Sequence, residues 1–275
     1  MGGGGTLIAR LRSDGRLVVR VAPLVTLAVL AKLATDLLGW DTVDLNPLYS
    51  GLVAATVFLI GFLLAGTLTD YKESERLPSE LAGRTETIGD ECQILYRDTG
   101  AEVARECLGH LGRLADDLRA WLRGTGTAEQ PLEGIERLNG YFLEFQPLTQ
   151  PNFIVRLKQE QSTLRLLVLR INTIKETSFV GAAYLIAQIS SFLLVTSLLI
   201  ADIAPLGAEL FLLGTITFLL TYMIALVKDL DDPFDYDGRG KAGAAEVSLW
   251  PLDYLERRMR AEYQALAGEA PRGSG

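Results

Sequence analysis

The sequence predicts an all-α membrane protein in which four transmembrane helices are combined with an α-helical cytosolic domain. Hydrophobic residues make up 49% of the chain, and the mean hydropathy is +0.23. These residues are gathered in long blocks, whereas a soluble domain of this length would disperse them. Between the blocks, apolar residues recur at helical spacing and no strand-like alternation persists.

Two apolar segments within residues 17–69 predict the first two transmembrane helices. The first, Leu17 to Leu38, is the weaker because it contains Arg20, Lys32 and Asp36. Lys32 and Asp36 lie four residues apart on one helical face, so we expect them to pair.

The second segment, Leu45 to Thr69, contains no charged residue and is long enough to cross a bilayer as a helix. The charged sequence DYKESERLP, residues 70–78, follows it directly. This junction predicts the point where a membrane helix leaves the lipid and enters a soluble domain.

Residues 70–176 predict a cytosolic domain made of helices. The sequence breaks this pattern at Gly100 and at GTGTAEQP, residues 124–131. Val155 to Lys175 predicts a long helix that leads directly into the third span. The apolar positions that recur at helical spacing are Leu81, Ile88, Cys92, Leu95, Val103, Cys107, Leu111, Leu114, Leu118, Leu122, Leu132, Ile135, Leu138 and Phe142.

The third and fourth spans are predicted within residues 177–228, and residues 229–275 are assigned to a cytosolic C-terminal tail. The N-terminal tail, residues 1–16, is rich in arginine, whereas the short links at 39–46 and 201–208 contain no lysine or arginine. Because basic segments stay in the cytoplasm, both termini and the middle domain are predicted there. The expected location is the inner (plasma) membrane, which the chain crosses several times.

The composition argues against several other functions. A net charge of −8 and a pI near 4.9 do not fit a nucleic-acid-binding protein. The sequence contains no P-loop, GxSxG, HExxH or dinucleotide fingerprint, so no enzyme is predicted. His110 is the only histidine, and Cys92 and Cys107 have no CxxC spacing. These three residues are interpreted as packing or surface positions, and no confident metal site is predicted.

Two segments resemble the bestrophin family of ion channels. In Val57 to Pro78, Gly61-Phe62 and Glu75-Arg76-Leu77-Pro78 match the family's second helix and its Glu-x-Leu-Pro element. Asp70-Tyr71-Lys72 stands where the family has an Arg-Trp-Trp cluster. After the fourth span, Asp232-Pro233-Phe234 resembles the family's Asn-Pro-Phe. The order of spans and cytosolic parts matches as well, and is similar to that of bacterial bestrophin-like membrane proteins.

The resemblance implies an oligomeric ring, a homopentamer, with one central pore for small ions lined by the second span. Its hydrophobic neck would comprise Ala54, Phe58 and Phe62, which are spaced to share one helical face. The alternative is that the two phenylalanines face lipid or pack between helices. Asp70 would form a charged ring at the pore exit. Animal bestrophins pass anions, whereas the acidic balance of this chain favours cations, so the sequence predicts a chloride or cation channel.

The resemblance also suggests a calcium site, since animal bestrophins form a calcium clasp after the fourth span. Asp229, Asp232 and Asp237 fall at plausible ligand positions and offer oxygen ligands. The alternative is a polar turn below the membrane, in which case no cofactor is expected. A non-conducting scaffold or sensor, whose helical domain binds a partner, is the main alternative to a channel. A small-solute transporter ranks last.

Overall fold

The computed structural model consists almost entirely of helices, which fall into two compact units. It describes residues 3–40, 43–44, 47–176, 181–203, 205–234, 236 and 246–268. The membrane unit comprises Met1–Tyr71, Ser178–Pro233 and Ala242–Ala245. The helical unit comprises Lys72–Thr177, Phe234–Lys241 and Glu246–Gly275.

Within the described parts of the chain, four helices are long and apolar enough to cross a membrane. They are α1 (Gly3–Leu37), α2 (Pro47–Thr99), α6 (Gly181–Leu199) and α7 (Leu206–Asp231), and each overlaps one of the four segments that the sequence predicts as spans. Helix α2 is by far the longest, and it contributes to both units. These helices support a membrane location for the protein.

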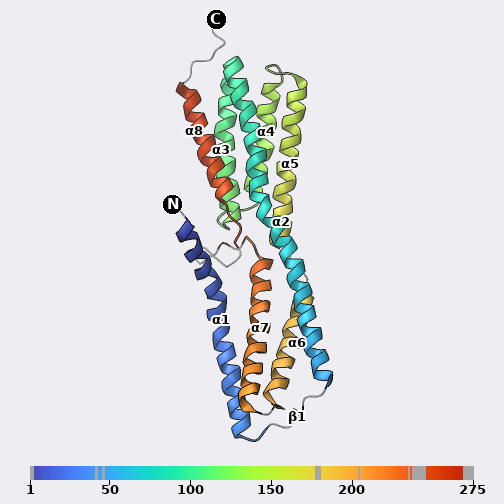
Figure 1. The fold of residues 1–275 in the computed structure, drawn as a ribbon. Helices are drawn as coiled ribbons and strands as arrows, with labels where there is room; N and C mark the ends of the chain where they lie inside the picture. Colours follow the sequence, from blue (N-terminus) through green and yellow to red (C-terminus); the bar gives the residue numbers. More distant parts are fainter. Residues whose placement is uncertain are drawn as a thin grey trace. The chain divides into compact units, whose positions relative to one another are not determined.

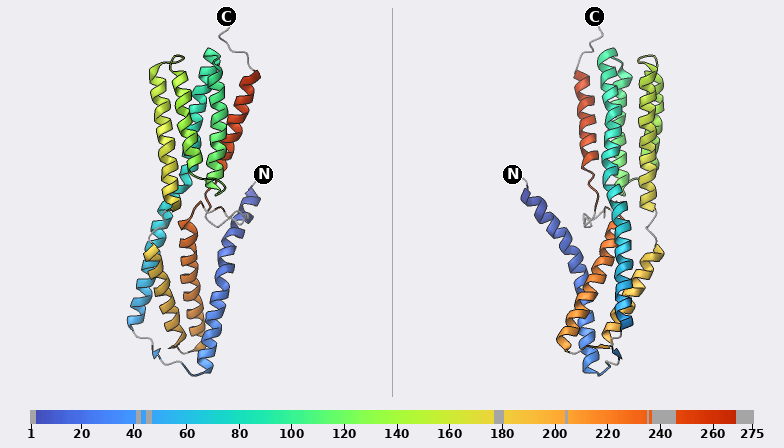
Figure 2. Two further views of the ribbon diagram at one scale, coloured as in Figure 1. Left: turned by 180° about the vertical axis from the view of Figure 1, so that it is seen from behind. Right: turned by 45° about the vertical axis from the view of Figure 1, so that its right-hand side comes forward.

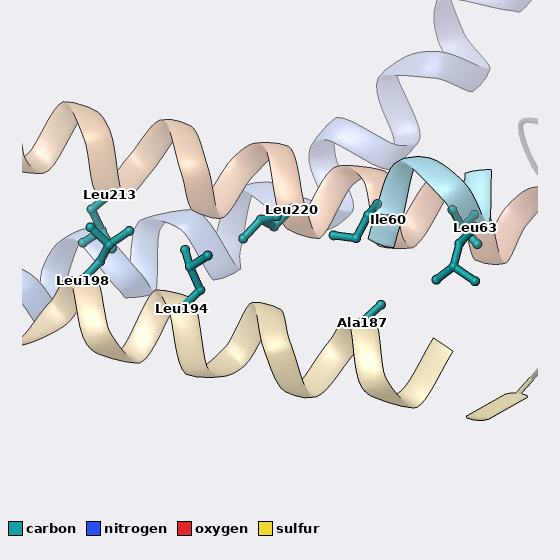
Figure 3. Close-up of a cluster of buried hydrophobic side chains, with 8 residues drawn as sticks. Ile60, Leu63, Ala187, Leu194, Leu198, Leu213 and Leu220 are labelled. Atoms are coloured by element: carbon teal, nitrogen blue, oxygen red, sulfur yellow. The ribbon is translucent and has the colours of Figure 1, made fainter. Parts of the chain in front are cut away.

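The core of the membrane unit is a cluster of aliphatic side chains from α2, α6 and α7. In Figure 3, Leu213 of α7 points toward Leu198 of α6, and Ile60 and Leu63 of α2 lie at the other end of the same cluster. Helix α1 packs against α7 and α6. Each span therefore buries one narrow stripe and leaves the rest of its surface exposed, as expected for helices that face lipid or other subunits.

Two short β-strands pair with each other and join the two links that the sequence predicts on the same side of the membrane. Strand β1 (Val43–Asp44) pairs in parallel with β2 (Ala201–Asp202), and Val43 is opposite Ala201. This pairing satisfies backbone groups where the chain turns between spans.

A buried ion pair lies at the same end of the membrane unit. The Nζ of Lys32 is 2.6 Å from Oε1 of Glu209, and the side chain of Lys32 is completely buried. Nζ donates to the carbonyl oxygen of Ala201 at 2.6 Å and, at a longer 3.4 Å, to that of Leu199. Among the described residues, Glu209 Oε1 accepts no well-aligned hydrogen bond, so the attraction between opposite charges holds this contact. The expected partner, Asp36, is exposed; within the described residues, the acidic side chain that Lys32 contacts is Glu209 of α7.

The helical unit is a bundle in which α3 (Glu102–Leu122), α4 (Glu129–Phe145), α5 (Pro151–Glu176), α8 (Trp250–Gly268) and the second half of α2 run side by side (Figures 1 and 2). The break predicted at Gly100 is present, and this glycine has φ of +68°, which a residue with a side chain rarely adopts. Val103 and Leu132 are only partly buried, but the other predicted apolar positions are buried in this core: Leu81, Ile88, Cys92, Leu95, Cys107, Leu111, Leu114, Leu118, Leu122, Ile135, Leu138 and Phe142.

Residues 229–275 are predicted as a tail, but helix α8, which lies within this range, is part of the helical unit. Met259 on α8 is fully buried, and a Cβ placed on Gly89 of α2 would lie 2.8 Å from its Sδ. A glycine at this position therefore allows α8 to approach α2 closely. Tyr96 of α2 donates to the carbonyl of Leu266 at 3.1 Å and ties the other end of α8 to the bundle.

His110 is a buried residue of this bundle. Its Nε2 lies 2.7 Å from the carbonyl oxygen of Gly134, so Nε2 must carry the hydrogen and donate it. Burial lowers the pKa of His110, and the smaller opposing effect of this hydrogen bond does not reverse the shift. The imidazole is thus a neutral packing group that links α3 to α4.

Removing one member of the buried ion pair should destabilise the protein strongly. Lys32→Met or Glu209→Gln leaves the other charge buried alone, and we expect each to cost about 3–5 kcal/mol of unfolding free energy. The double variant should lose less than the sum. Unfolding of the purified protein in detergent measures these values, with Asp36→Asn at an exposed site as the control. Single variants no less stable than Asp36→Asn would show that the pair is not needed.

The stability of the protein should fall as the pH drops below about 6.5, in part because of His110. The folded-state pKa of this histidine is lowered, so the unfolded state binds the proton first and is favoured as pH falls. His110→Gln keeps an N–H donor but cannot titrate. The parent should therefore lose more stability than this variant when unfolding is compared at about pH 7.5 and pH 5.5. Equal losses in the two proteins would contradict the prediction.

Candidate functional site

Helix α2 presents two different faces within the membrane unit. Thr56, Ile60, Leu63 and Thr67 are buried against the other helices. The predicted neck residues are on the opposite side: Ala54 is exposed, Phe58 is 76% exposed and Phe62 is 65% exposed. The structure therefore brings Ala54, Phe58 and Phe62 together on one exposed stripe, as their spacing predicts.

The exposed side of α2 also carries small residues that leave room for a neighbouring helix. Gly51, Ala55, Gly61 and Ala65 are all exposed. A Cβ placed on Gly51 or Gly61 would meet no atom of this chain within 4 Å. Small residues on a membrane helix permit close packing against another helix. The surface therefore combines small residues, which leave room for another helix, with two large aromatic side chains that are exposed in the single chain.

The charged sequence after Thr69 is stabilised by ion pairs. Asp70 is partly buried and takes part in a polar or electrostatic interaction. In the helical unit, Arg170 of α5 binds Glu73 of α2 through two hydrogen bonds of 2.8 Å, one to each carboxylate oxygen. Arg76 lies 3.0 Å from Glu80 on the same helix. A two-point contact between arginine and carboxylate is strong and directional, so it fixes α5 against α2.

The structure describes part of the acidic segment that follows the fourth span. Asp229 is partly buried, Asp232 is exposed, and both already take part in interactions. Asp237 lies outside the described residues. Among the residues that the structure describes, no three His, Cys, Asp or Glu side chains are grouped so that they could hold a metal ion. The apolar member of the Asp232-Pro233-Phe234 motif, Phe234, is buried.

The interactions that sequence reasoning missed are the ion pairs between helices. Lys32–Glu209 and Glu73–Arg170 each join residues far apart in the chain. One signal was available for the first pair, because a lysine inside a membrane segment needs a partner at the same depth. Lys32 is near the end of α1 and Glu209 near the start of α7, so two antiparallel spans would place them at the same level.

Comparisons with solved structures identify the fold. A variant of a bacterial bestrophin homologue from Klebsiella pneumoniae superposes with a TM-score of 0.72 at 15% identity, covering 92% of this chain and 100% of that chain. A second variant of the same homologue gives 0.72 at 15% identity, with 89% and 99% covered. A structure described as a membrane protein gives 0.72 at 15% identity, with 92% and 99% covered.

These matches confirm, at the level of the fold, the resemblance that the sequence predicts. The chain has a bestrophin-like fold, and it covers nearly the full length of the solved chains. No protein-family model and no curated protein match the sequence.

The two faces of α2 should respond differently to truncation. Ile60→Ala and Leu63→Ala create cavities in the membrane unit and should each cost about 2–5 kcal/mol. Phe58→Ala and Phe62→Ala remove exposed side chains, and we expect a much smaller loss. Unfolding in detergent distinguishes the two groups. If the phenylalanine variants were as unstable as the aliphatic ones, these rings would be packed against another helix.

Proposed function

We propose that the protein is an ion channel formed by a homo-oligomeric ring, a homopentamer, with a central pore lined by α2. The observation that carries this proposal is the bestrophin-like fold, which extends over 92% of the chain at a TM-score of 0.72. A channel of this kind requires no catalytic residues, and none is proposed. We place the ring in the inner (plasma) membrane, with both termini and the helical unit in the cytoplasm, since the basic residues lie on that side of the predicted spans.

In this proposal, the exposed stripe of α2 forms the neck of the pore. Phe58 and Phe62 are large, apolar and exposed in the single chain, so five copies around an axis would surround the pore with aromatic rings. Such a constriction controls ion flow by excluding water from the narrow section. Ala54 is the smallest of the three residues, so the neck would be wider at that level. The small residues beside the stripe would let adjacent α2 helices pack closely.

The neck residues are uncharged, so ion selectivity is assigned to charges outside the neck. Asp70 follows the apolar part of α2 and would place a ring of carboxylates at the pore exit. Negative charge near a narrow pore raises the local concentration of cations, so we favour a cation channel over a chloride channel. Calcium binding by Asp229, Asp232 and Asp237 stays a prediction, and ion conduction in this proposal does not depend on it.

Truncating the neck should increase conduction. Phe58→Ala or Phe62→Ala would widen and wet the constriction, and we expect single-channel conductance in planar bilayers to rise several-fold. Phe192→Ala, which removes an exposed phenylalanine of α6, is the matched control and should conduct like the parent.

Two outcomes of the same experiment would contradict the proposal. Parent-like conductance in both α2 variants, together with altered conductance in Phe192→Ala, would exclude α2 as the pore helix. A parent protein that never conducts would favour the scaffold alternative. The mass of the detergent-solubilised protein checks the ring separately, since five copies of the 30.0-kDa chain are expected.

Asp70→Asn should weaken the preference for cations. In a KCl gradient, the reversal potential of the parent should lie toward the potassium equilibrium value, and the variant should move it toward zero because the carboxylate ring is lost. Asp36→Asn, at an exposed position near the end of α1, serves as the charge-matched control. A parent potential near the chloride equilibrium value would refute the cation assignment. An unchanged potential in Asp70→Asn would remove Asp70 from the selectivity mechanism.

A further inference from the structure

Helix α8 begins with two aromatic side chains that the helical unit leaves on its surface. Trp250 is 62% exposed and Tyr254 is 44% exposed, although the same helix buries Leu252, Leu255 and Met259. The two rings stack on each other, with centroids 5.5 Å apart and planes inclined by 21°. They thus form a single ordered aromatic surface on the side of α8 that faces away from the bundle.

Contacts within the helical unit place this surface at one particular end of the bundle. Asp253, between the two aromatic residues in sequence, is 3.3 Å from Arg119 and 3.6 Å from Arg123, at the end of α3. The Nζ of Lys175, near the end of α5, donates to the carbonyl of Trp121 at 3.2 Å. The start of α8, the end of α3 and the end of α5 therefore lie together.

Chain connectivity places this end of the bundle close to the membrane. Helix α5 ends at Glu176, and α6, which is apolar enough to cross a membrane, begins at Gly181. Five residue steps span at most about 18 Å even when fully extended. The end of α5 must therefore lie within that distance of the start of a membrane span, and the start of α8 lies beside the end of α5 in the helical unit.

The side chains present at this end suit the boundary between lipid and water. Tryptophan and tyrosine combine an apolar ring with a polar group, and they are enriched at the level of the lipid headgroups. Arg123 and Arg257, both exposed, lie at the same end of the unit. Counting Arg119, Arg123, Lys175 and Arg257 against Asp253, Glu256 and Glu176 leaves a nearly balanced charge. The aromatic pair, and not net charge, would therefore attract this end of the helical unit to the lipid surface.

We propose that Trp250 and Tyr254 are a membrane-interface anchor, which inserts into the lipid headgroup region beside α6. The anchor would fix the start of α8, and through α3 and α5 the adjoining end of the helical unit, against the bilayer surface. This assignment requires that the chain spans a membrane, but it is independent of whether the protein conducts ions. The partner is the lipid surface itself.

Fluorescence quenching of the full-length protein in phosphatidylcholine vesicles tests this anchor. Vesicles that contain lipids with a nitroxide on the headgroup quench tryptophan only at short range. Trp40 is also exposed, so the experiment uses Trp40→Phe as the parent; Trp121 is buried. We expect strong quenching in this parent and loss of the quenched component in Trp40→Phe/Trp250→Phe.

A matched control places a tryptophan at the other end of the helical unit. Phe153 is partly exposed near the start of α5, about 35 Å along the helix from Glu176 at 1.5 Å per residue. Phe153→Trp in the Trp40→Phe/Trp250→Phe background should not be quenched. Equal quenching with and without Trp250 would overturn the proposal. A second outcome would also overturn the proposal: Trp250 emission that the nitroxide lipids do not quench in vesicles but that is shifted to the blue in detergent-solubilised oligomers. A neighbouring copy of the chain would then cover Trp250 and Tyr254.

Discussion

The burial of a lysine in an apolar environment is the constraint on which the membrane unit depends. A charged ammonium group there is costly unless hydrogen-bond acceptors and an opposite charge surround it. Lys32 obtains these from Glu209 of α7 and from the backbone carbonyls of Leu199 and Ala201. One side chain of α1 thereby joins the end of α6, strand β2 and the start of α7. The pairing of β1 with β2 follows at the same place, where the two short links meet.

Helix α2 is central to the proposed function because one of its faces is buried against other helices and the opposite face is exposed. Its inward residues, such as Ile60 and Leu63, belong to the cluster shared with α6 and α7. Its outward residues Phe58 and Phe62 are mostly exposed and contribute little to the packing of the single chain. Exposure alone is equally compatible with lipid and with a pore, since both leave these rings outside the monomer. The proposed channel assigns this exposed stripe to the pore and the small residues beside the rings to contact with further copies of α2.

Local patterns in the sequence predicted much of this architecture, while long-range contacts escaped them. Apolar length is sufficient to recognise the four spans, and the break at Gly100 follows from a backbone conformation that suits glycine. The spacing rule for helices suggested Asp36 as the partner of Lys32, because such rules compare only neighbours on one helix. Helix α8 was missed because it has few apolar residues, and they are buried only where α8 packs against Gly89 of α2 and the adjoining surface of α3. The sequence alone does not show that these distant segments meet.

The ion pairs on α2 also show why the charge of the whole chain is a poor guide to selectivity. The net charge of −8 suggests an acidic path for ions. However, Glu73 is held by Arg170 at 2.8 Å, and Glu80 by Arg76 at 3.0 Å. Each pair presents little net charge beyond its immediate surroundings, because the two fields largely cancel and salt screens the remainder within about 10 Å. In the proposed channel, a permeating ion would therefore respond to the local arrangement of charges near the neck more than to the overall balance of the chain.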